Sequence, residues 1–265
     1  WDDLKLFFNA RRNDPELLLS GATSFDGSDD YISIADSSSI DVAGTAVTFV
    51  WWMKSIAMAS GDRIFDKESG NTGYMISSSG TNKIFFRLNA GGGQNVTSNS
   101  SYNVDQWNHI ACTYNGSTMK IYINGSLDSN TSSYTGSIVA NTTPLLIGKY
   151  TLNSSYNFTG SLANVGIWNR ALSSSEIESI YWKGQYADLK GTELTNLVSW
   201  YNLSADANDS TGTNNGTNNG ATFLTDAYSA SSPFLPRIQD KASDTVANYG
   251  EVYGGNAVSF DGTND

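Results

Sequence analysis

The sequence predicts an all-β protein: an antiparallel jelly-roll β-sandwich with one short helix near its C-terminal end, followed by the start of a second, incomplete repeat. Three observations predict it. The 265 residues include 25 glycines and only 15% charged residues, which suits short strands joined by turns. Segments of alternating apolar and polar residues recur roughly every 8 to 15 residues. An Asn-Gly step at Asn115 has such a segment on both sides and predicts a hairpin.

The expected strands follow one another along the chain. Residues 4–9 form the first candidate, ahead of a charged loop. In residues 47–54, Val47, Phe49, Trp51 and Met53 fall on one face, which is typical of a strand that faces a core. The other expected strands are residues 63–66, 73–76, 83–88, 145–148 and 162–168, with a hairpin over residues 107–125.

A short helix is expected directly after the strand at residues 162–168. Ser173 followed by Glu176 three residues later forms a capping box, and Gly184 is a suitable residue to end the helix. Its apolar face is formed by Ile177, Ile180 and Tyr181.

Two landmarks occur twice in the same order and predict a tandem repeat. A Ser-Phe-Asp-Gly segment begins at Ser24 and again at Ser259, and residues 197–202 resemble residues 4–9. We therefore expect a complete sandwich over residues 1–190, and a linker with the opening strands of a second sandwich over residues 191–265. Strands at residues 197–203 and 256–260 need partners from the first domain, from residues beyond this sequence, or from a neighbouring chain by strand addition.

Three of these segments carry a family resemblance. They are the strand that runs into Asn169, Arg170 and the capped helix, the hairpin at residues 107–125, and the segment from Ser24 to Ile32. Together they resemble the laminin-G-like, concanavalin A-like lectin/glucanase sandwich family, which is related to the pentraxins. The resemblance covers roughly residues 20–182. The repeated segments also resemble tandem lectin-like domains of surface proteins and bacteriophage structural proteins.

Charge and composition exclude several classes of function. The net charge is −11 and the only adjacent basic pair is Arg11 and Arg12, so nucleic acid is not an expected partner. No apolar run is long enough to span a membrane. The single cysteine, Cys112, cannot form an intramolecular disulfide, and its place in an apolar alternation predicts a buried side chain.

No catalytic residue is identified, and the protein is not expected to be an enzyme. A retaining glycosidase needs two carboxylates about 5 Å apart. The six glutamates fall in expected loops or in the helix, and no carboxylate pair falls at i, i+2 in an expected strand. His109 is the sole histidine, and a structural or hydrogen-bonding role is expected for it.

An acidic turn at Asp26, Asp29 and Asp30 has two interpretations. Carboxylates that crowd one loop can bind calcium, and calcium is the one cofactor that we consider. A simpler interpretation is a tight turn in which Asp26 accepts backbone N–H bonds and Gly27 adopts a positive φ.

Exposed aromatic rings are the expected route to sugar binding, because a ring can stack on the face of a pyranose. The candidates are Tyr102, Tyr150, Tyr156 and Trp52. The chain also contains 11 Asn-x-Ser/Thr triplets, which are potential glycosylation sites. These are Asn95, Asn99, Asn115, Asn124, Asn130, Asn141, Asn153, Asn157, Asn202, Asn208 and Asn215.

Together these features predict a non-catalytic recognition or adhesion module on the outside of a cell or on a virion surface. Its expected partner is a glycan or a cell-surface polysaccharide. The alternative is a structural surface, decoration or filament protein whose homo-oligomer or virion neighbours share strands. A glycoside hydrolase is the least expected function.

Overall fold

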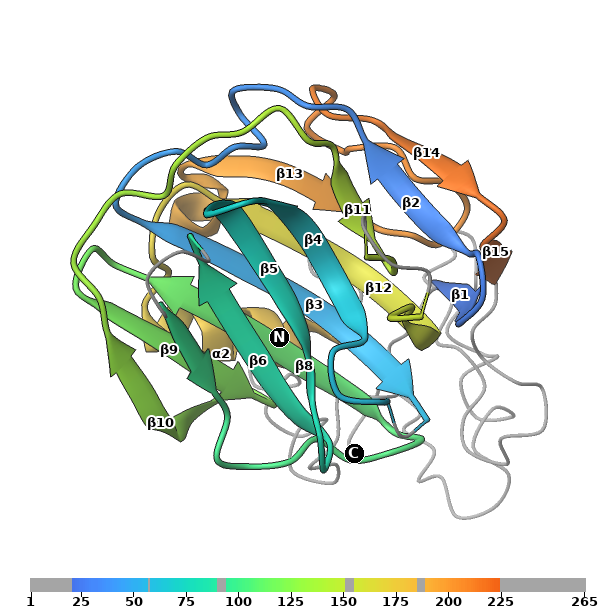
Figure 1. Ribbon diagram of the computed structural model, residues 1–265, viewed down its shortest axis with the longest axis horizontal. Coiled ribbons are helices and arrows are strands. Elements are labelled where there is room, and N and C mark those ends of the chain that lie inside the picture. Colours follow the sequence, from blue (N-terminus) through green and yellow to red (C-terminus); the bar gives the residue numbers. More distant parts are fainter. Residues whose placement is uncertain (1–20, 57, 90–93, 151–154, 185–188, 225–265) are drawn as a thin grey trace, which may run out of the picture. The chain divides into compact units, whose positions relative to one another are not determined.

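A computed structural model describes residues 21–56, 58–89, 94–150, 155–184 and 189–224. Within this part of the chain the strands form an eight-stranded and a seven-stranded antiparallel sheet (Figure 1). The eight-stranded sheet has the order β10-β9-β8-β3-β12-β1-β15, with β13 also paired to β12. The seven-stranded sheet has the order β14-β2-β11-β4-β5-β6-β7.

The strands of the eight-stranded sheet are β1 (Ala22–Asp26), β3 (Val47–Ser55), β8 (Trp107–Tyr114), β9 (Thr118–Ile123), β10 (Ser126–Ser133), β12 (Thr159–Trp168), β13 (Leu197–Tyr201) and β15 (Thr222–Leu224). Those of the seven-stranded sheet are β2 (Tyr31–Ile34), β4 (Arg63–Ser69), β5 (Thr72–Ser79), β6 (Lys83–Leu88), β7 (Asn95–Thr97), β11 (Leu145–Ile147) and β14 (Gly216–Asn219). In the part of the chain that the structure describes, the helices are α2 (Ser174–Lys183) and the 3-10 helix η4 (Gly191–Leu194).

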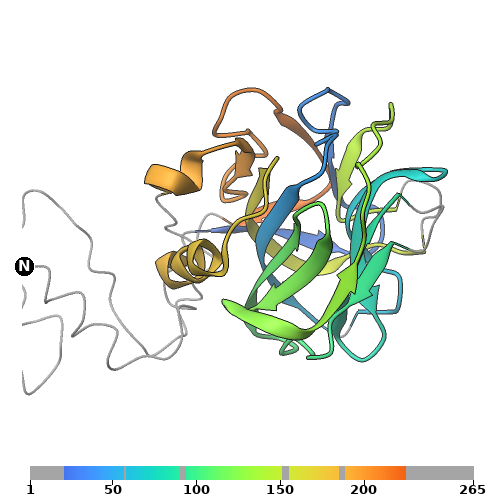
Figure 2. The ribbon, with the colours of Figure 1, turned by 90° about the vertical axis from the view of Figure 1, so that its left-hand side faces the viewer.

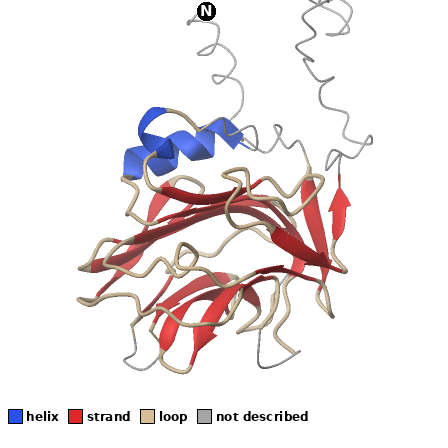
Figure 3. Cartoon of the chain, turned by 90° about the horizontal axis from the view of Figure 1, so that it is seen from above, coloured by secondary structure: helices blue, strands red, loops and turns tan. Residues whose placement is uncertain are grey.

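The main core lies between the two sheets, which form the two layers seen in Figure 3. Alternation puts Val47, Phe49, Trp51 and Met53 of β3 into this core, as predicted, and each is at most 1% exposed. Cys112 is also fully buried there. The predicted sandwich is therefore confirmed.

Helix α2 covers the outer face of the eight-stranded sheet (Figure 2 and Figure 3). The predicted capping box is confirmed: Ser173 accepts the backbone N–H of Glu176, and the Glu176 carboxylate accepts the backbone N–H of Ser173. The helix ends at Gly184. Its residues Ile177 and Ile180 pack in one buried cluster with strand residues of the sheet beneath.

Residues 197–224 complete the same sandwich. Strand β13 pairs with β12, β14 pairs with β2, and β15 pairs with β1. The expected boundary at residue 190 therefore falls inside the described sandwich, and strand β13 finds its partner in the same chain. The repeated segment at residues 256–265 lies outside the described residues.

Asp209 holds this closing segment together. Its carboxylate accepts the backbone N–H groups of Trp200 at 2.9 Å and Asn214 at 3.0 Å. The Asn214 side chain in turn accepts hydrogen bonds from Ser37 and Ser39, in the loop that follows β2. The segment is thus joined to the rest of the sandwich by side chains as well as by strand pairing.

His109 lies under α2 and is fully buried. Its ring is 5.2 Å from Trp52 and 5.7 Å from Tyr181 between centroids. Neither ring nitrogen has a hydrogen-bond partner, and burial lowers the pKa of His109 from 6.5 to about 3. His109 therefore has a structural role as a buried ring, and its burial should make the stability of the fold depend on pH.

We expect acid to destabilise the protein through this histidine. Between about pH 6.5 and pH 3 the unfolded chain protonates His109 while the folded chain does not, so the free energy of unfolding should fall by about 1.4 kcal/mol per pH unit from this residue alone. Urea unfolding of the wild type and of His109→Phe across this range measures the difference. The wild type should lose stability more steeply on acidification, whereas parallel profiles would contradict the assignment.

Candidate functional site

The outer face of the seven-stranded sheet carries a row of charged and polar side chains. In β4, Ile64 and Phe65 both enter the core at a bulge, after which Asp66 and Glu68 share the outer face by alternation. Asp66 pairs with Met75 of β5, and Met75 pairs with Arg87 of β6. The strands β4, β5 and β6 lie side by side in Figure 1, so this row crosses the sheet.

Arg63, at the start of β4, connects this row to Tyr150. The Arg63 Nε atom is 3.5 Å from a carboxylate oxygen of Asp66, and both side chains are at least 90% buried. The Arg63 guanidinium also lies over the Tyr150 ring, 4.3 Å from its centroid, in a cation–π contact. A third contact, from Arg63 to the carbonyl of Gly61, fixes the guanidinium.

Tyr156 lies beside Tyr150 at the surface. The two rings meet edge to face with centroids 6.1 Å apart, and Tyr156 is 37% exposed. The backbone N–H of Arg63 donates to the carbonyl of Tyr156, which ties this loop to β4. A Cβ atom at Gly61 would lie 3.0 Å from the Tyr156 ring, so glycine leaves room for it. We call Arg63, Asp66, Tyr150 and Tyr156 the tyrosine site.

A second arginine–carboxylate pair lies in the same row. Arg87 donates from Nε to Glu68 at 2.7 Å and makes a further bond from its terminal nitrogen to the other Glu68 oxygen. This pairing raises the pKa of Arg87. The sequence interpretation missed Arg63, Asp66, Glu68 and Arg87. The Asp-x-Glu spacing in β4 was the signal that could have found the two carboxylates.

The structure corrects the expectation that no carboxylate pair stands at i, i+2 in a strand. Strand β4 runs to Ser69, beyond its expected end at residue 66, and therefore includes both Asp66 and Glu68. Each carboxylate is held by an arginine.

Two of the predicted sugar-binding rings are buried. Trp52 is 2% exposed, because α2 covers its face of the sheet and Tyr181 stacks on it at 5.8 Å. Tyr102 is 3% exposed, and burial raises its pKa. Neither ring can meet a sugar at the surface of this structure, so both leave the set of candidates.

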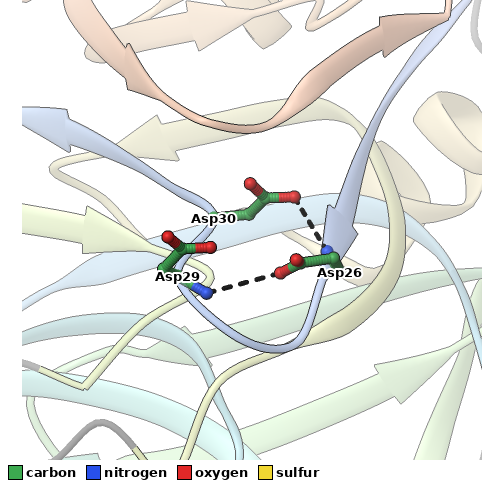
Figure 4. A group of neighbouring side chains, drawn as sticks. All are labelled: Asp26, Asp29 and Asp30. Carbon is green, nitrogen blue, oxygen red and sulfur yellow. Dashed lines mark hydrogen bonds between the residues drawn. The ribbon is translucent and has the colours of Figure 1, made fainter.

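The acidic turn forms as predicted between β1 and β2 (Figure 4). Asp26 accepts the backbone N–H groups of Ser28 and Asp29, which lowers its pKa, and Asp30 accepts the N–H of Asp26. Gly27 has a φ of 81°. These bonds support the turn interpretation. One oxygen from each aspartate also lies within 4.8 Å of the others, a spacing that fits a hard cation, so calcium stays a prediction.

The potential glycosylation sites differ in exposure. Those with exposed side chains are Asn99, Asn115, Asn130, Asn202, Asn208 and Asn215, while Asn95, Asn124 and Asn141 are half-buried. The Asn141 amide nitrogen donates to the backbone of Lys67, which a sugar on that nitrogen would disturb. Asn157 is 4% exposed and donates to the carbonyl of Ser28, so this asparagine is not at the surface. Asn153 lies outside the described residues.

Among the described residues, the helices are too short and too polar to cross a bilayer.

Residues 26–178 match the family model of the concanavalin A-like lectin/glucanases superfamily. The matched residues are more than half of the chain. Pappalysin-1 of Mus musculus is 33% identical over 104 residues, which are 37% of this chain and 6% of that protein. The sushi, von Willebrand factor type A, EGF and pentraxin domain-containing protein 1 of Rattus norvegicus is 28% identical over 145 residues, 51% of this chain and 4% of that protein. The chain thus spans a small fraction of these relatives.

Two solved structures share the fold. One is a protein of Bacteroides ovatus to which carbohydrate binding has been ascribed, with a TM-score of 0.62 and 21% identity over 77% of this chain and 59% of that chain. The other is a heptameric SAP-like pentraxin of Limulus polyphemus, with a TM-score of 0.55 and 16% identity over 80% of this chain and 97% of that chain.

Proposed function

Because the chain belongs to the concanavalin A-like lectin/glucanases superfamily, we propose that it is a non-catalytic recognition module that binds a glycan at the tyrosine site, outside the cell. The observation that carries this proposal is the exposed Tyr156 ring, which meets Tyr150 edge to face, while the Tyr150 ring packs against the guanidinium of Arg63. An exposed ring offers a stacking surface for a pyranose. The hydroxyl groups of Tyr150 and Tyr156 can donate and accept hydrogen bonds with a sugar.

The arginine contacts support a binding role over a catalytic one. A glycosidase needs two carboxyl groups that reach the glycosidic bond. The Asp66 side chain is fully buried beside Arg63, and both oxygens of Glu68 accept bonds from Arg87. Binding without hydrolysis also agrees with the ascribed role of the Bacteroides ovatus protein.

A glycan array tests the proposal. We expect the full chain to bind at least one class of oligosaccharide, and binding should persist with a calcium chelator, because no residue of the acidic turn belongs to the tyrosine site. The bound oligosaccharide should be recovered intact after prolonged incubation, as mass spectrometry would show.

Three outcomes would contradict parts of the proposal. A blank array with and without calcium would remove the glycan as the partner and favour the structural alternative. Binding that requires calcium would move the site to the acidic turn. Cleavage of the oligosaccharide would show that the module is catalytic.

A further inference from the structure

The outer face of the seven-stranded sheet carries another tyrosine near the tyrosine site. Ile32 and Ile34 of β2 enter the core, so alternation puts Tyr31 on the outer face, where it is half-buried. Ile147 of β11 pairs with Ile32 on one side and with Phe65 of β4 on the other. Strand β11 therefore lies between β2 and β4 (Figure 1), and Tyr31 lies at the same end of the sheet as the start of β4.

Lys149 connects Tyr31 to the tyrosine site. It comes directly before Tyr150 in the chain, and its ammonium lies over the Tyr31 ring, 4.3 Å from the ring centroid. The Tyr150 ring lies over the guanidinium of Arg63, at the start of β4. These two consecutive side chains thus contact the strands on either side of β11. Together with Tyr156, which meets Tyr150, they form a row along this end of the sheet.

The Lys149 ammonium has hydrogen-bond donors that a ligand can use. Lys67 and Lys183 each have a carboxylate within 4.0 Å, but no carboxylate of the described residues lies that close to Lys149. An ammonium carries three N–H donors, and contact with the face of a ring does not use all of them. The Lys149 side chain is half-buried, so its end is within reach of a molecule at the surface.

The row is longer than one sugar. Neighbouring strands are about 4.8 Å apart, so β2 and β4 are separated by about 10 Å. Tyr156 lies on the β4 side of this row, beside Gly61, whereas the Lys149 ammonium lies on the β2 side, over Tyr31. A single pyranose stacked on Tyr156 therefore leaves Lys149 without a contact, and the following units of a longer chain can reach it.

We propose that the tyrosine site binds an oligosaccharide chain rather than a single sugar, and that Lys149 is its second anchor. This inference rests on the proposed function and adds a length requirement to it. The Lys149 ammonium donates hydrogen bonds to oxygen atoms of a unit beyond the one that stacks on Tyr156. Tyr31 is a positioning residue, because its ring holds the ammonium in place.

Calorimetric titration of a length series tests the inference. The probes are the tetrasaccharide that gives the strongest array signal and the monosaccharide and disaccharide with the same linkage. The wild type should bind the tetrasaccharide about tenfold or more tightly than the monosaccharide. Lys149→Met, which keeps a long side chain but removes the ammonium, should lose about tenfold in tetrasaccharide affinity and keep the monosaccharide affinity.

Two further sets of variants separate anchoring from general effects. Lys120→Met is the matched control, because it removes the same charge from a half-buried lysine on β9, in the other sheet. It should keep the wild-type affinity for every length. Tyr31→Leu should weaken tetrasaccharide binding only, and Tyr31→Phe should restore it, because the ring and not the hydroxyl group holds Lys149.

The outcomes separate this inference from the proposed function. Equal affinities of the wild type for the monosaccharide and the tetrasaccharide would overturn the inference and leave glycan binding intact. A folded Lys149→Met variant that keeps the wild-type preference for length would do the same. A wild type that binds no glycan of any length would overturn both. Circular dichroism checks folding, and if Lys149→Met does not fold, the wild-type length series decides alone.

Discussion

A chain that ends at residue 190 is expected to lose cooperative folding, whereas one that ends at residue 227 should keep it. The shorter chain lacks β13, β14 and β15, which pair with β12, β2 and β1. It also loses the buried side chains of Trp200, Tyr201 and Leu203, each at most 6% exposed. At about 1.5 to 3 kcal/mol for each such side chain, the loss approaches the whole stability of a typical domain.

Urea unfolding followed by tryptophan fluorescence and circular dichroism measures this effect. The chain of residues 1–227 is the matched control, because it keeps the same N-terminus and the complete sandwich. Its transition should be single and cooperative. A chain of residues 1–190 with the same transition midpoint would show that the sandwich closes without residues 197–224, and that the expected boundary at residue 190 is the functional one.

The sequence was sufficient for the elements whose signals are local. Alternation in residues 47–54 identified the core face of β3, and the Ser173–Glu176 spacing identified the capped helix. The sequence was not sufficient to identify the strand with which β13 pairs, which is β12. The pattern of residues 197–201 shows that they form a strand, but the edge that a strand joins depends on residues far away in sequence, and the repeated landmark pointed to a new domain.

Only part of the candidate site could be predicted from the sequence. Tyr150 and Tyr156 were predicted because they fall in an expected loop, and the structure places their rings together. Trp52 was misassigned because alternation gives the face of a side chain but not what covers that face, which here is α2. Arg63 and Asp66 were missed because the bulge at Ile64 and Phe65, which aligns them, is a tertiary feature.

The second prediction with a large expected effect is that Tyr156→Ala abolishes most of the binding. Losing a stacked ring at the centre of a small interface costs about 2 kcal/mol or more, which is a weakening of about thirtyfold. Trp182→Ala is the control, because Trp182 is also an exposed ring, at 42%, but belongs to α2 on the other side of the sandwich.

Calorimetric titration of the oligosaccharide selected on the array into the wild type, Tyr156→Ala and Trp182→Ala is the most direct measurement of where the glycan binds. If the tyrosine site is the binding site, Tyr156→Ala loses affinity by about thirtyfold and Trp182→Ala keeps the wild-type value. An unchanged affinity in Tyr156→Ala, or the same loss of affinity in both variants, would contradict glycan binding at the tyrosine site.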